Sequence, residues 1–140
     1  MNRGGGTSSL LFTAALAVGL FTACGAGCGP GEAPKPDLPV SVSPGWTLRG
    51  IAVSEPPVGL PQLGTPPVCW KADYTGESGA TVLVCGYRAS AFEAEQRMPF
   101  SANQVKFHKG VYLVLVRWDN ASRAAVTALV GAIERSLPER

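Results

Sequence analysis

The pattern of apolar and polar positions divides this chain into three parts. The first part contains an uncharged apolar run, LLFTAALAVGLFTA, over residues 10–23. The second carries spaced prolines and small residues with few apolar anchors. In the third, short β-favouring runs alternate with turn formers, and two segments repeat apolar residues at helical spacing. The pattern predicts a signal peptide (residues 1–23), a linking segment (residues 24–44) and one small domain (residues 45–140).

The domain is predicted to contain five strands and two helices. The predicted strands, each bounded by turn formers, are residues 46–53, 68–74, 81–88, 105–107 and 111–118. One helix should begin at a Ser90 capping box and end near Met98. The other should begin at an Asp119 or Asn120 cap and end near Leu137. The order β-β-β-α-β-β-α predicts an α+β domain, an antiparallel sheet of about five strands with both helices packed on one face.

Two of the predicted strands should form a hairpin around the turn formers of residues 75–79. Centring the hairpin on Glu77 places Cys69 directly opposite Cys85. The Cα atoms of an opposed pair lie ~4.5–5.5 Å apart, which is within the range of a disulfide. The register therefore predicts a Cys69–Cys85 disulfide. The face that carries Trp70 should be the core face, and the disulfide should lie on the other face.

The N-terminal residues have the pattern of a secretory signal. Arg3 supplies a positive start, the apolar run of residues 10–23 follows, and small residues lead to Cys24. This run is too short for a membrane-spanning helix. Export would place the chain where disulfides form, in agreement with the predicted pairing.

The residues Phe21-Thr22-Ala23-Cys24 resemble the lipobox of bacterial lipoproteins. The resemblance implies cleavage before Cys24, with a diacylglycerol on its sulfur and an acyl chain such as palmitate on its amine, so that the membrane is a partner through the lipid. Cys28 is the alternative lipidation residue, because Phe21 stands where the family favours Leu. Gly25 after the cysteine implies an outer-membrane anchor facing the periplasm, if the host has an outer membrane. A plain secretory signal and an uncleaved anchor remain alternatives.

Prolines are concentrated between Pro30 and Pro67, in two groups. The first group, up to Pro44, predicts an extended tether that would hold the domain ~40 Å from the membrane, with a docking ligand as the alternative. The second group lies between apolar runs and predicts an ordered loop pinned to the domain by Leu60 and Leu63.

From about Pro39 onward the chain resembles small, uncharacterised exported proteins of bacteria. The residues that carry the resemblance are Leu38-Pro39, Gly45-Trp46, residues 60–64, 80–84, 90–94 with Gln96, 105–118 and 124–137. These motifs are structural, so the resemblance implies the fold and adds no activity.

Residues with catalytic or metal-binding potential are few. The chain has a formal net charge of +2, which gives no electrostatic footprint for nucleic acid. Its single histidine, His108, falls in a predicted turn, so no nucleophile–histidine arrangement and no metal site can be built, and no cofactor is implied. Most aromatic residues should be core, although Tyr87 with Tyr112 could line a groove.

These observations favour a non-enzymatic binding or accessory module of the cell envelope with a protein partner of unknown identity. Two alternatives remain open. A small-ligand-binding protein requires an apolar pocket with converging polar groups. A carboxylate-based hydrolase requires two acidic side chains that meet in a cleft, for example Glu55 with Asp73.

Overall fold

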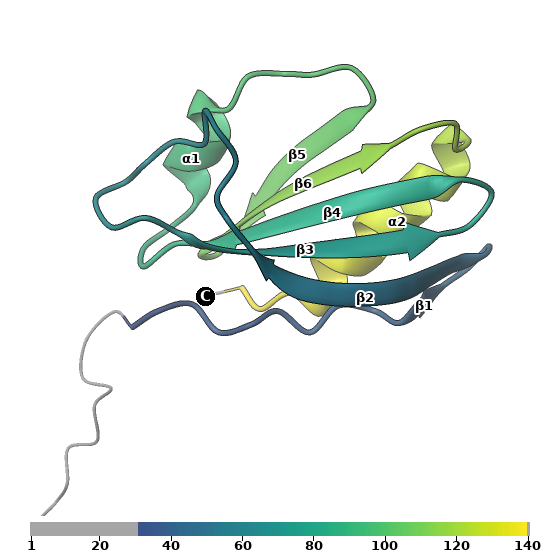
Figure 1. Ribbon diagram of the computed structural model, residues 1–140, viewed down its shortest axis with the longest axis horizontal. Helices are drawn as coiled ribbons and strands as arrows, with labels where there is room; N and C mark the ends of the chain where they lie inside the picture. Colours follow the sequence, from purple (N-terminus) through teal and green to yellow (C-terminus); the bar gives the residue numbers. More distant parts are fainter. Residues whose placement is uncertain (1–30, 140) are drawn as a thin grey trace, which may run out of the picture.

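The computed structural model describes residues 31–139, which form one six-stranded antiparallel sheet with two helices (Figure 1). The spatial order of the strands is β1-β2-β3-β4-β6-β5. The elements are β1 (Ser41–Val42), β2 (Trp46–Ser54), β3 (Val68–Thr75), β4 (Gly79–Gly86), α1 (Phe92–Arg97), β5 (Gln104–Lys109), β6 (Tyr112–Trp118) and α2 (Arg123–Ser136). The predicted α+β class and antiparallel sheet are confirmed, and the short strand β1 is added to the five that were expected.

The hairpin of β3 and β4 has the predicted register. Cys69 pairs with Cys85, and their sulfurs form a disulfide with a Cα–Cα distance of 4.1 Å. The pairing continues to Thr75 and Gly79, so the turn is two residues tighter than the run of turn formers suggested. The disulfide prediction is therefore confirmed, although both cysteines are only 1% exposed and belong to a second buried cluster instead of an open face.

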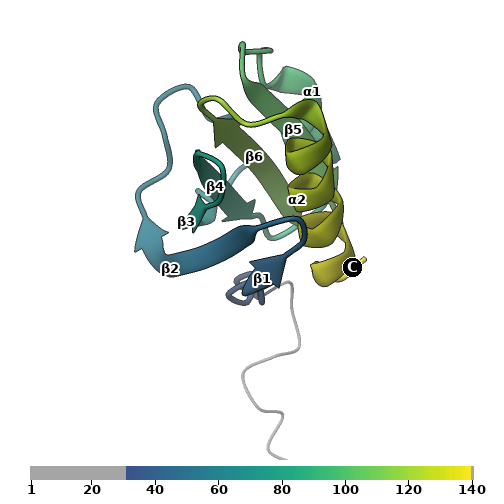
Figure 2. The ribbon, with the colours of Figure 1, turned by 90° about the vertical axis from the view of Figure 1, so that its right-hand side faces the viewer.

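The main core lies between the sheet and α2, around which the sheet curls (Figure 2). Leu129 and Ile133 of α2 are fully buried against the strands. Trp46 at the start of β2 donates its indole N–H to the carbonyl of Ala125 at 2.8 Å. The N-cap of α2 is Ser122, whose hydroxyl accepts from the amide of Ala125, and not the predicted Asp119 or Asn120.

The helix α1 packs on the opposite face of the sheet, which corrects the prediction that both helices share one face. Ala91 and Ala94 are buried in a cluster with the disulfide and Leu113. Along each strand, the residues of this cluster alternate with residues of the main core, so the two clusters lie on opposite faces of the sheet. The predicted capping box is not formed, because Ala91 is the N-cap and the Ser90 hydroxyl accepts only from the amide of Phe92.

Residues 31–44, which we call the strap, lie against the domain and are not a free tether. Their small apolar side chains enter the core, where Ala33, Leu38 and Val42 are each less than 9% exposed. The strap contains β1, which pairs with the first residues of β2. A proline-rich segment offers many carbonyls without amide partners, and tyrosine hydroxyls from the sheet satisfy two of them. The folded unit therefore begins at least twelve residues before the predicted boundary at residue 45, since Ala33 is part of the core.

Candidate functional site

The face of the sheet that carries the disulfide has three rows of side chains across β3, β4, β6 and β5. The strand registers define each row. The first row contains Cys69, Cys85, Leu113 and His108; the second contains Lys71, Leu83, Leu115 and Lys106; the third contains Asp73, Thr81, Arg117 and Gln104. The face therefore changes from apolar to polar along the strands. Because α1 and the loop after β2 cover the first row, the second and third rows are left beside a hollow.

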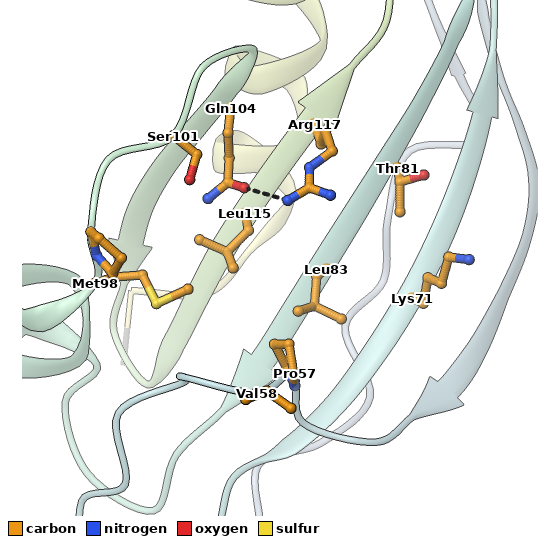
Figure 3. A pocket seen from close by; sticks show the side chains of 11 residues that line it. Pro57, Val58, Lys71, Thr81, Leu83, Met98, Ser101, Gln104, Leu115 and Arg117 are labelled. Atoms are coloured by element: carbon orange, nitrogen blue, oxygen red, sulfur yellow. Dashed lines mark hydrogen bonds between the residues drawn. The ribbon is translucent and has the colours of Figure 1, made fainter.

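This hollow is a groove of about 500 Å³, and its lining residues are shown in Figure 3. Leu83 and Leu115 form its floor. One wall is Pro57 with Val58, from the loop after β2, and the other is the segment after α1 that begins at Met98. The volume lies within the range of small-molecule sites, and the lining is mostly apolar with a few polar groups, as such sites require.

The polar end of the groove is cationic. Arg117 donates a hydrogen bond to the side-chain oxygen of Gln104 at 3.2 Å, and no carboxylate of the described residues lies within salt-bridge distance of it. The Nζ atom of Lys71 lies 4.0 Å from Oδ1 of Asp73. The same carboxylate oxygen accepts a hydrogen bond from the hydroxyl of Thr81 at 3.3 Å. Lys71 therefore has an acidic neighbour at salt-bridge distance, whereas Arg117 has none at that distance among the described residues and shares a smaller hollow with Asp73 and Asp119.

The wall at Met98 is held to the sheet by Lys106. The ammonium group of Lys106 donates to the carbonyl oxygens of Glu95 and Met98. Met98 is the C-cap residue of α1. The same group lies 4.3 Å from the ring centroid of Phe100, so its charge also contacts an aromatic face. Lys106 is thus engaged by the wall, which leaves Lys71 and Arg117 as the cations that line the groove.

The single histidine lies in β5 and not in the predicted turn. His108 pairs with Leu113, its ring contacts the carboxylate of Glu95, and it lies edge-on to Phe92 at 5.4 Å. The turn that follows is shorter than predicted, because Lys109 already pairs with Tyr112. His108 therefore helps to hold α1 on the sheet.

Tyr87 and Tyr112 do not line a groove, since both are at most 2% exposed. The Tyr87 hydroxyl donates to the carbonyl of Pro61 at 2.9 Å, and the Tyr112 hydroxyl donates to that of Pro34 at 2.7 Å. Burial raises the pKa of both phenols above its usual value of 10.0. These side chains fasten the two proline-rich segments to the domain, in agreement with the predicted ordered loop around Leu60.

The carboxylate pair considered for hydrolysis does not form. Ser54 pairs with Cys69, whereas Gly50 pairs with Asp73, so Glu55 and Asp73 lie toward opposite ends of this strand pair, about 15 Å apart along it. Within residues 31–139, no cluster of three or more metal-ligating side chains is found. Cys24 and Cys28, the candidate lipidation residues, lie outside the described residues.

The sequence did not point to the groove residues. Leu83 and Leu115 have the pattern of buried strand positions, because the apolar run of β6 faces both sides of the sheet. The available signal was the period of two, which places Lys71, Leu83, Leu115 and Arg117 on one face once the registers are known.

No family model, curated protein or solved structure matches this chain. In the part of the chain that the structure describes, no helix is long and apolar enough to cross a membrane.

Proposed function

We propose that this chain is a lipid-anchored protein of the cell envelope that binds a small ligand and performs no catalysis. The observation that carries the proposal is the groove over Leu83 and Leu115. It combines an apolar floor, two walls from different parts of the chain and a polar end, which are the properties expected of a ligand site.

The contrast between the two faces of the sheet supports this choice. On the face beneath α2, buried side chains fill the core from the strap to the end of the helix. On the other face, the disulfide row is covered, whereas the groove remains over the next row, where Leu83 is half-buried and Leu115 is 7% exposed. A groove with an apolar floor beside a cationic end favours a ligand over a purely structural role.

The anchor in this proposal is the lipid on Cys24 implied by the lipobox-like residues. Nine residue steps separate Cys24 from Ala33, where the strap enters the core. Even a fully extended chain of this length spans only about 30 Å. The domain would therefore work close to the membrane surface, nearer than a tether that continued to Pro44 would allow.

Site-specific photo-crosslinking in the native host tests the binding role. Benzoyl-phenylalanine at Val58, an exposed residue that lines the groove, should capture a ligand as a discrete increase in protein mass. The matched control is Val53, which is 75% exposed on β2 and does not line the groove. Equal capture at both positions, or none at Val58, would contradict the proposal.

Metabolic labelling with palmitate tests the anchor separately. The chain should carry the label, and Cys24→Ala should abolish it, while Cys28→Ala should retain it. Loss of label only in Cys28→Ala would move the anchor to the alternative residue, and label in neither parent nor variant would remove the anchor from the proposal.

A further inference from the structure

We infer that the ligand of the groove is an amphiphile with one apolar chain and an anionic head group, a carboxylate or a phosphate. The inference rests on the proposed binding function and specifies its ligand. It is carried by the polarity of the groove, in which the apolar floor and Arg117, which forms no salt bridge with the described residues, occupy successive rows of one sheet face.

The apolar part of the groove lies over the second row of side chains. Leu83 and Leu115 are direct neighbours across β4 and β6, and Met98 and Pro57 rise on either side of them. A single alkyl chain laid on this floor would remove apolar surface from water on three sides. Each buried methylene contributes ~0.8 kcal/mol, which is about fourfold in affinity.

The anion-binding part is the third row, which lies two residues further along each strand than the second row. Arg117 lies directly opposite Thr81 on β4 and Gln104 on β5. Gln104 orients the guanidinium with its neutral side-chain oxygen, so the positive charge remains available to a ligand. A planar guanidinium matches the oxygens of carboxylates and phosphates.

The net charge around the groove agrees with an anionic ligand. None of the residues that line it carries a carboxylate, and two are cations. Two acids, Asp73 and Asp119, share a smaller hollow with Arg117, and Asp73 is engaged by Lys71 and Thr81. A cationic head group would be repelled by Arg117, because no carboxylate lines the groove. A neutral head group would gain no charge–charge attraction to Arg117.

The experiment uses the chain from residue 24 onward with Cys24→Ser and Cys28→Ser, which contains every strand and helix of the folded unit and needs no detergent. Dodecanoate, dodecyl phosphate, dodecanol and dodecylamine are titrated by NMR, which locates the contact, and by calorimetry. We expect both anions to shift amide signals of residues 81–83 and 115–117 and to bind at least tenfold more tightly than the alcohol or the amine. The ratio between the two anions identifies the preferred head group.

Charge variants test the role of Arg117. Arg117→Gln should weaken dodecanoate binding about tenfold and leave dodecanol unchanged. Arg123→Gln, which removes the same charge from α2 on the other face, should change neither. Thr81→Glu places a carboxylate opposite Arg117 and should abolish the preference for anions, whereas Thr81→Gln should keep it.

The outcomes separate this inference from the proposed function. Equal affinity for dodecanoate and dodecanol at the groove, unaffected by Arg117→Gln, would overturn the anionic head group and leave groove binding intact. Absence of any amphiphile from the groove would overturn the inference, and crosslinking at Val58 would then decide whether a ligand of another class occupies it.

Discussion

Ala33 lies directly over Gly86, so closely that a methyl group added to Gly86 would stand 2.4 Å from the Cβ of Ala33. This contact joins the strap to the end of β4. The ring of Tyr112 flanks the same glycine, and its hydroxyl binds the strap one residue further on, at the carbonyl of Pro34. The missing side chain of Gly86 is thus the space that the strap occupies.

Gly86→Ala should dislodge the first part of the strap. The added methyl group cannot share space with Ala33, and overpacking of this kind costs ~1–3 kcal/mol. Urea unfolding should report that loss, and amide exchange of residues 33–42 should accelerate. Gly50→Ala is the matched control, because nothing lies within 4 Å of a methyl group there. Ala33→Gly combined with Gly86→Ala should restore much of the stability; failure of this rescue would show that Gly86 serves another purpose.

Tyr74 should make the stability of the domain sensitive to alkaline pH. Its hydroxyl donates to the carbonyl of Pro39 at 2.7 Å, and burial raises its pKa from 10.0 to about 12. The folded state thus favours the protonated phenol. This contribution is fully present below pH 10 and is lost as the pH rises toward about 12.

The comparison is between the parent chain and Tyr74→Phe, with urea unfolding measured at several values of pH. At pH 8 the variant should be less stable by about 1 kcal/mol, because the hydrogen bond is lost. Between pH 10 and pH 12 the parent should lose stability more steeply than the variant, so the difference should narrow. Parallel curves would mean that Tyr74 is not responsible for the alkaline loss.

The alternation of side chains across a tight hairpin made the Cys69–Cys85 pairing predictable. A turn centred on Glu77 sets the register, and the register determines which residues face each other. The same local pattern could not tell which face α1 would cover. Its buried side consists of Ala91 and Ala94, which are too small to indicate a direction.

The strap and the groove depend on contacts between residues far apart in the chain. The strap has no apolar periodicity, and it is held by the hydroxyls of Tyr74 and Tyr112, 35 and 78 residues away from the carbonyls they bind. The groove exists because the loop at Pro57 and the segment at Met98 form separate walls and leave Leu83 only half-buried between them. Neither the position of the strap nor the groove depends on the sequence of a single helix or strand, so local sequence patterns could not predict them.

The disulfide should contribute a large part of the stability. The bond joins residues 16 apart, and a loop of this length corresponds to ~3 kcal/mol in the chain-entropy description. The double variant Cys69→Ala with Cys85→Ala should lower the free energy of unfolding by about that amount, measured with urea in parallel with the parent. Since both sulfurs are buried, the native parent should also resist reduction by dithiothreitol until urea is added. Rapid reduction of the native chain would contradict the buried position of the bond.

Lys106→Met should loosen one wall of the groove without removing any residue that lines it. The ammonium group now holds the carbonyls of Glu95 and Met98, and methionine retains the apolar stem but cannot donate. We expect faster amide exchange at residues 95–101, a loss of about 1 kcal/mol in stability and weaker ligand binding. Lys109→Met is the matched control, because Lys109 lies on the same strand and binds the carbonyl of Glu134 in α2. If both variants weakened binding equally, the effect would come from the lost charge; a selective effect of Lys106→Met would establish that the fixed position of Met98 shapes the groove.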